Sequence, residues 1–269
     1  MSAAGLPRLP NHAQVAGVAG PPRHDPAAFQ NDISVMTTHI LSRTFGLPRP
    51  FGLLLLALTL SQPARAADLP PLKPGDIVFQ NTSGSAREAI MLASGTQYTH
   101  VGLVDIDASG RAVVIEAAGP VRTVPLDRWI KNGSGKKVTV KRLKNLSEEH
   151  AKEAVAQARS YLGRPYDHFY YETRDQIYCS ELIYAAFKDG ANISVGVEEK
   201  VRDLNIGTTA ARKLIQDRWR QHPLCKKQRV ENFQACYDLI LEQTLVTPAS
   251  IARDKQVETI YTNFGKDAE

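Results

Sequence analysis

A cysteine, a histidine and a glutamate in this sequence are the residue types of a thiol-dependent catalytic triad. Cys179 lies at the start of a predicted amphipathic helix, where unpaired backbone N–H groups and the helix dipole favour thiolate over thiol. A thiol nucleophile also needs a base, and the base needs a group that fixes its orientation. We expect His100 to be the base and Glu116 the orienting residue. The alternative is that Cys179 is a small apolar residue packed beneath a helix.

A predicted hairpin over residues 98–117 brings His100 towards Glu116. Residues 98–106 and 111–117 have strand patterns, and residues 107–110 have a turn composition. Paired residues of an antiparallel hairpin have numbers with a constant sum, here about 216 to 218, which places Glu116 opposite His100 or its neighbour. A register slip of one residue would separate the two side chains onto opposite faces, and a simple surface pair is the alternative interpretation.

The remaining pattern predicts one α+β domain with an antiparallel sheet and packed helices. Ser147 and the glutamates after it are typical of a helix start, and an apolar stripe then runs to Leu162. A helical elaboration over residues 208–245 is expected to cover the site or the sheet. Further strands are predicted at 76–80, 138–143 and 257–261, and further helices at 85–93, 125–131, 208–221, 233–245 and 246–252.

Five sequence blocks in this order resemble the permuted papain-like hydrolases of the YiiX/YebB type, relatives of the NlpC-type cell-wall peptidases and of lecithin retinol acyltransferase. The resemblance runs from about Leu72 to Phe264 and implies a circularly permuted papain-like core. It also implies Cys179 as nucleophile, His100 as base and Glu116 as the orienting residue. The blocks are Pro74-Gly75-Asp76-Ile77-Val78-Phe79, Thr99-His100-Val101-Gly102-Leu103, Val114-Ile115-Glu116-Ala117, Leu162-Gly163-Arg164-Pro165-Tyr166-Asp167 and Tyr178-Cys179-Ser180-Glu181-Leu182.

Residues 1–66 are predicted to be an N-terminal extension and a secretory signal peptide, and 67–269 the hydrolase domain. The apolar run over 51–60 follows Arg43 and Arg49 and precedes the cleavage site Ala64-Arg65-Ala66. The run is short for a membrane anchor, so a periplasmic or secreted protein without a stable anchor is expected. Met36 is the more natural start, since residues 1–35 are an unusual extension ahead of a signal peptide.

Composition and charge favour an ordinary globular protein with no nucleic-acid partner. Hydrophobic residues make up 43% of the chain and charged residues 23%, which is typical of folded soluble domains. Without the five Arg and two Asp of residues 1–66, 28 basic and 26 acidic residues remain, a net charge of +2. Near-neutrality with no long basic tract makes nucleic-acid binding improbable.

The three cysteines predict one disulfide and one free thiol, because exported proteins tend to pair their cysteines. Cys225 and Cys236 lie in one polar segment and are the expected pair, which leaves Cys179 unpaired. The alternative is that both are free and buried.

No cofactor or metal is expected, since metal-ligand spacings and phosphate-binding or dinucleotide-binding motifs are absent from the mature region. The hydroxyls of Tyr166 and Tyr178 are candidates for oxyanion or substrate binding, with simple packing as the alternative.

The sequence therefore predicts an exported cysteine hydrolase that cleaves an amide or ester through an acyl-enzyme. The expected partner is a peptide, a peptidoglycan fragment, or an acyl-lipid or N-acyl substrate, and acyl transfer or thioester cleavage is a variant of the same chemistry. A non-catalytic peptide- or lipid-binding module on the same fold is the alternative.

Overall fold

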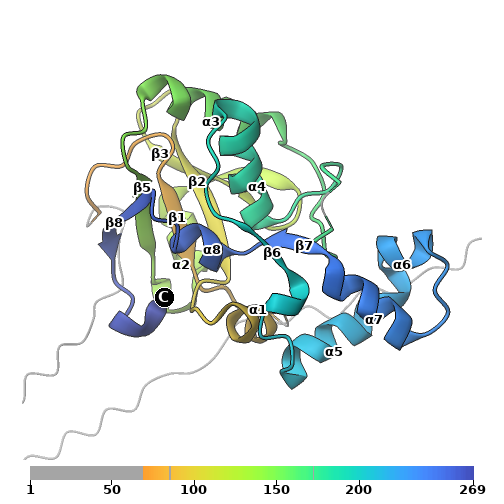
Figure 1. Cartoon of the computed structure of the whole chain (residues 1–269). Coiled ribbons are helices and arrows are strands. Elements are labelled where there is room, and N and C mark those ends of the chain that lie inside the picture. Colours follow the sequence, from red (N-terminus) through yellow and green to blue (C-terminus); the bar gives the residue numbers. More distant parts are fainter. Residues whose placement is uncertain (1–68, 85, 172) are drawn as a thin grey trace, which may run out of the picture. The chain divides into compact units, whose positions relative to one another are not determined.

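A computed structural model describes residues 69–84, 86–171 and 173–269, and within them a six-stranded antiparallel sheet carries the core (Figure 1). The strand order is β4-β3-β2-β1-β5-β8, and every neighbouring pair is antiparallel. The strands are β1 (Ile77–Gln80), β2 (His100–Ile106), β3 (Ala112–Ala117), β4 (Val121–Pro125), β5 (Thr139–Leu143) and β8 (Val257–Thr262). The α+β class with an antiparallel sheet is as predicted, whereas β4 was not predicted. The predicted leader over residues 1–66 lies outside the described residues.

The two faces of the sheet bury different sets of side chains, because successive residues of a strand point to opposite sides. One face packs Val78, Val104 and Val114 against Trp129 of α2 (Leu126–Asn132). The other face packs against α3 (Glu148–Ser160), α4 (Cys179–Ala185), the π turn Ala186–Gly190 and α8 (Pro248–Ala252). The side chain of Ser147 caps α3 by accepting a hydrogen bond from the backbone N–H of His150, as the sequence predicted.

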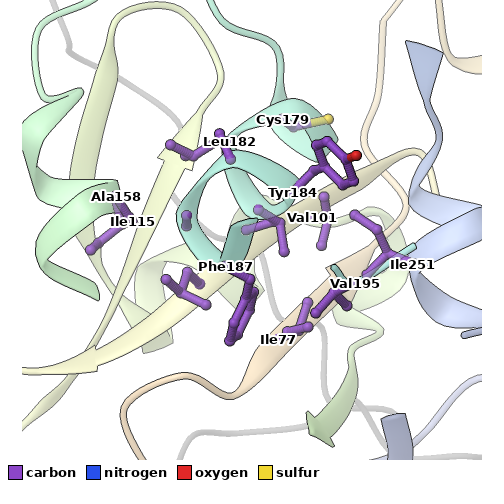
Figure 2. Close-up of a cluster of buried hydrophobic side chains, with 14 of the residues drawn as sticks. Ile77, Val101, Ile115, Ala158, Cys179, Leu182, Tyr184, Phe187, Val195 and Ile251 are labelled. Atoms are coloured by element: carbon purple, nitrogen blue, oxygen red, sulfur yellow. The ribbon is translucent and has the colours of Figure 1, made fainter. Parts of the chain in front are cut away.

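Helix α4, which begins at Cys179, is buried on all sides rather than amphipathic. Every residue from Cys179 to Ala185 is buried, which corrects the expectation of one exposed face. The reason is that the sheet covers one side of α4 while α3, α8 and the C-terminal segment cover the others. Figure 2 shows Leu182 of α4 and Phe187 of the π turn after it in the same cluster as Ile115 and Val101 of the sheet. The surrounding core therefore holds Cys179 in one position.

The C-terminal elaboration is helical and includes a small second sheet. It comprises α5 (Thr209–Arg218), a 3-10 turn (Trp219–Gln221), α6 (Pro223–Lys227) and α7 (Phe233–Glu242), and α5 packs against α1 (Arg87–Ser94). Short 3-10 turns also occur at Ser134–Lys136, Val201–Asp203 and Lys266–Ala268. The segment predicted as a helix to residue 245 instead ends in β7 (Thr244–Val246), which pairs with β6 (Glu198–Lys200). Among the described residues, no helix combines the length and apolar character that crossing a bilayer requires.

The predicted disulfide is present. Cys225 of α6 and Cys236 of α7 are bonded, with their Cα atoms 5.3 Å apart, and Cys179 is free. The bonded pair lies in a small apolar core of its own with Val201 and Ile240. The covalent link therefore joins two helices of the elaboration.

Candidate active site

The ring of His100 lies against the carboxylate of Glu116, with Nε2 of the histidine 2.7 Å from Oε2 of the glutamate. The hairpin pairs Leu103 with Ile115 and so has a constant sum of 218, at the upper end of the predicted range. This register sets Glu116 opposite Gly102, two positions from His100, rather than opposite His100 or its neighbour. The two side chains still meet, because positions two apart share a face and diagonal neighbours lie within reach.

Gly102 leaves room on the sheet face between His100 and Glu116. A Cβ atom at this position would lie 2.3 Å from Cγ1 of Val114 and 3.7 Å from Nε1 of Trp129. Both of those atoms belong to well-buried residues that cannot move aside easily. A glycine is therefore needed here because a Cβ atom would collide with the Val114 side chain of the neighbouring strand, whereas Trp129 would lie at ordinary contact distance.

Two residues that the sequence did not single out hold the carboxylate of Glu116. Trp129 donates from Nε1 to Oε2 at 2.9 Å, and Arg122 donates from Nε to Oε1 at 2.9 Å. Burial raises the pKa of Glu116, but the interactions with His100 and Arg122 outweigh it and lower the pKa overall. The glutamate is thus an anion held by donors on both oxygens. Strand β4 pairs Arg122 with Glu116, so predicting a strand over 121–125 would have indicated this contact. No local sequence pattern indicated Trp129.

Cys179 and His100 form the reactive pair. His100 is the first residue of β2 and Cys179 the first of α4, and the thiol hydrogen-bonds with the His100 ring and with the Val101 backbone. Because Nε2 of His100 faces Glu116, Nδ1 is the nitrogen left for the thiol. The structure therefore brings together the three predicted residues in the predicted order.

Burial and hydrogen bonding act in opposite directions on this pair. Burial raises the pKa of Cys179, but the hydrogen bond and charge of His100 outweigh burial and lower the pKa below its usual value. Burial lowers the pKa of His100, but the hydrogen bonds to Cys179 and Glu116 outweigh burial and raise it to about 9. Both shifts favour a thiolate beside an imidazolium over a neutral thiol beside a neutral ring.

The two candidate tyrosines have different surroundings. The Tyr166 hydroxyl interacts with Cys179 and with Tyr170, and burial together with the thiolate charge raises its pKa well above the usual value. It remains a protonated donor beside the sulfur. The Tyr178 hydroxyl instead accepts a hydrogen bond from the Val246 backbone N–H at 3.0 Å, which fixes it to β7. The structure thus favours Tyr166 over Tyr178 as a donor to an oxyanion, and adds Tyr170 as a neighbour that the sequence did not indicate.

Cys179 lies in the wall of a cavity of about 140 Å³ whose lining is almost wholly apolar. Helices α1, α5 and α7 supply much of this lining, so the C-terminal elaboration builds a wall of the site. Among the lining residues are the aliphatic side chains Ala89, Ile90, Ala93, Val201, Leu204, Ile206, Ala211, Leu214, Ile215, Ile240, Leu245 and Val246. No sequence pattern predicted this cavity.

The rate of Cys179 alkylation should depend on pH as expected for a thiolate–imidazolium pair. The thiolate forms as pH rises through the lowered pKa of Cys179, and the imidazolium is lost as pH rises through about 9. Alkylation by iodoacetamide should therefore already be fast below the usual thiol range, and hydrolytic activity should fall near pH 9. Alkylation followed by mass spectrometry reports on Cys179 alone, because the other two cysteines are bonded. A single alkylation midpoint near the ordinary value of about 8.5 would contradict the pair.

Comparison with known proteins agrees with the fold and with the predicted family. Residues 71–261 match the family described as "Permuted papain-like amidase enzyme, YaeF/YiiX, C92 family". The "Uncharacterized protein YiiX" of Escherichia coli strain K12 is 30% identical over 209 residues, which cover 77% of this chain and 94% of that protein. A crystal structure of YiiX from Escherichia coli O157:H7 is similar with a TM-score of 0.63 and 27% identity, covering 72% of this chain and 98% of the other.

The YiiX of that crystal structure is described as a metalloprotein. In the part of this chain that the structure describes, no three or more His, Cys, Asp or Glu side chains gather in a way that could hold a metal ion. The Glu116 oxygens are already used by His100, Arg122 and Trp129, so the donor set here does not fit a metal site.

On the family match over residues 71–261 and the identity to YiiX, the chain belongs to the permuted papain-like amidase family of the YaeF/YiiX type.

Proposed function

We propose that this protein is a cysteine amidase or esterase that transfers an aliphatic acyl group to Cys179 and then to water. The observation that carries the proposal is the Cys179–His100 pair, whose pKa shifts favour thiolate and imidazolium, set in the wall of a mainly apolar cavity. Family membership supports amide-bond chemistry in general. The cavity supports the choice of acyl chain over wall peptide.

The proposed reaction has two halves that share one base. The thiolate of Cys179 attacks the acyl carbonyl carbon, and the C–N or C–O bond breaks as His100 gives its proton to the leaving amine or alkoxide. A thioester to Cys179 remains. His100, now neutral, takes a proton from water, whose oxygen attacks the thioester, and the C–S bond breaks to release the carboxylic acid and the Cys179 thiolate beside the reprotonated His100. Glu116 keeps the His100 ring oriented and stabilises its positive charge through both halves.

Two donors are placed to stabilise the oxyanion that forms in each half. Cys179 is the first residue of α4, so its backbone N–H has no acceptor within the helix. The hydroxyl of Tyr166 lies beside the sulfur and keeps its proton. A donor aimed at the developing charge commonly contributes about 10²-fold or more to the rate.

An aliphatic acyl chain suits the cavity better than a peptidoglycan peptide. Wall peptides carry carboxylates and many amides, and burying these against aliphatic side chains without partners would cost several kcal/mol. An alkyl chain instead gains about 0.8 kcal/mol for each methylene buried. The proposal therefore takes N-acyl or acyl-lipid compounds as the substrate class.

The rate should depend on acyl chain length, and filling the cavity should abolish that dependence. With chromogenic N-acyl amides, kcat/KM should rise about fourfold per added methylene until the cavity is full. Ile90→Trp on α1 places a bulky ring in the lining and should lower the rate for long acyl groups while leaving acetyl groups little affected.

Leu92→Trp is the matched control for this test. Leu92 lies on the same helix but is exposed and does not line the cavity, so the long-chain preference should persist in this variant. Equal rates for short and long acyl groups in the native protein would refute the aliphatic assignment. Saturable binding of acyl compounds without any turnover would instead favour the non-catalytic binding module.

The proposal also includes export to the periplasm or beyond. It is supported by the apolar run and small-residue cleavage site before residue 67. The disulfide between Cys225 and Cys236 supports it independently, because such bonds persist in oxidising compartments.

A further inference from the structure

Two buried polar atoms in the lining of the apolar cavity lack hydrogen-bond partners. These are Nε2 of His222, whose residue is 4% exposed, and Oε1 of Gln243, whose residue is 8% exposed. An unsatisfied buried polar atom commonly costs about 1–3 kcal/mol. Two such atoms in one cavity therefore indicate a ligand group that satisfies them when it binds.

The neighbours of the two side chains determine which of these atoms donates and which accepts. Nδ1 of His222 accepts from the Leu224 backbone N–H at 3.3 Å and caps α6. Burial lowers the pKa of His222, with small opposing contributions from Phe169 and Gln243, so the ring is neutral. A neutral ring with an accepting Nδ1 carries its proton on Nε2. This nitrogen is therefore a donor.

Gln243 supplies the acceptor. Its Nε2 donates to the backbone carbonyl of Phe169 at 3.2 Å and also to that of Tyr170. Only the amide nitrogen can donate to two carbonyls, so the side chain is oriented with Oε1 away from them. The Gln243 side chain and the Phe169 backbone lie near enough to His222 to raise its pKa through weak hydrogen bonding, but neither contact of His222 Nε2 reaches full hydrogen-bond geometry.

We propose that His222 and Gln243 together recognise one hydroxyl group carried by the aliphatic chain of the bound acyl compound. A hydroxyl oxygen can accept from His222 and donate to Gln243 through a single atom, which suits two adjacent protein groups. A trans amide in the ligand would fit poorly, since its N–H and C=O point in opposite directions. Polar residues such as Arg218 and Thr99 also line the cavity, but most of its exposed wall is apolar, so a mainly aliphatic chain with one hydroxyl matches it. This inference rests on the proposed acyl-chain function.

Binding measurements on a catalytically silent protein separate this inference from the proposed function. The probes are straight-chain N-methyl acylamides, unsubstituted or with one hydroxyl at successive positions, titrated calorimetrically into the Cys179→Ala protein. One positional isomer should bind about tenfold more tightly than the unsubstituted amide, as expected for one satisfied buried pair. His222→Asn in the same protein should abolish that preference, because asparagine can still cap α6 but lacks the Nε2–H donor.

A second variant and a control complete the test. Gln243→Met removes the acceptor at similar volume and should also abolish the preference, with circular dichroism reporting whether the fold is kept. Ile215→Ala enlarges the apolar wall and should weaken both probes equally, leaving the tenfold ratio unchanged. If no isomer is preferred, or if the preference survives His222→Asn, the pair holds a water molecule only and the inference is wrong. Preference without turnover in the native protein would overturn the proposed function alone.

Discussion

Cys179→Ala should lower kcat/KM for an acyl amide by about 10⁴-fold or more while the protein remains folded. The sulfur is the nucleophile of the proposed reaction, and removing the nucleophile of such a unit commonly removes nearly all of its rate enhancement. Cys179 is 5% exposed in a cluster of apolar side chains, where alanine fits with a loss of about 1 kcal/mol of unfolding free energy. Hydrolysis rates and the thermal unfolding midpoint measure the two effects separately.

Tyr184→Phe is the control for that variant. Tyr184 lies on the same buried helix, but its hydroxyl interacts with Glu198 and Lys188 rather than with the reactive pair. The phenylalanine variant should therefore lose some stability and keep its activity. A Cys179→Ala protein that retained a tenth of the native rate would show that the hydrolysis does not pass through the thiol.

Glu116→Gln should lower kcat/KM by about 10² to 10⁴-fold and move the alkylation midpoint of Cys179 upward. The glutamine can still accept from His100, but it no longer supplies the negative charge that helps to raise the pKa of His100 to about 9. The imidazolium is then less stable, and a weaker cation beside the sulfur stabilises the thiolate less. The pH profile of alkylation, measured beside the rate of hydrolysis, reports this electrostatic change directly.

The fold should tolerate the glutamine at position 116. If its oxygen faces His100 and Trp129, its amide nitrogen faces Arg122, whose side chain is 52% exposed and can turn towards water. The expected loss is about 1–3 kcal/mol of unfolding free energy. Asp105→Asn is the matched control. Asp105 is likewise a buried carboxylate, on the adjacent strand β2, but it is bound by Arg159 and not by His100. That variant should lose stability with no change in the alkylation midpoint, and an equal shift in both proteins would disprove the role of Glu116.

The C-terminal elaboration gives this protein its cavity as well as its disulfide. Helix α5 contributes several side chains to the cavity wall and α7 contributes Ile240, and the Cys225–Cys236 bond ties α7 to α6. His222 lies at the start of α6 and Gln243 just after α7, so the same segment supplies the two orphan polar atoms. The papain-like core thus carries the reactive pair, while this segment contributes to the proposed choice of acyl group.

Local pattern was sufficient for the elements that carry the three reactive residues. Strand-like composition on either side of a turn predicted β2 and β3 to within two residues, and the turn limited the register to three values. The start of α4 at Cys179 and the capping of α3 by Ser147 followed from short-range signals in the same way. These features depend on interactions between residues a few positions apart, and such interactions are visible in a sequence.

The tertiary structure alone decided the features that depend on residues distant in the chain. Trp129 reaches Glu116 only because α2 packs on one face of the sheet, and Gly102 is needed only because the Val114 side chain of the paired strand lies against it. The full burial of α4 requires segments from both sides of it in the sequence to close around one helix. The cavity likewise has walls from α1, α5 and α7, and hydrophobic periodicity shows that each helix has an apolar face without showing what that face meets. Residue types therefore indicated the chemistry, while long-range packing determined how the carboxylate is held and what kind of cavity adjoins the sulfur.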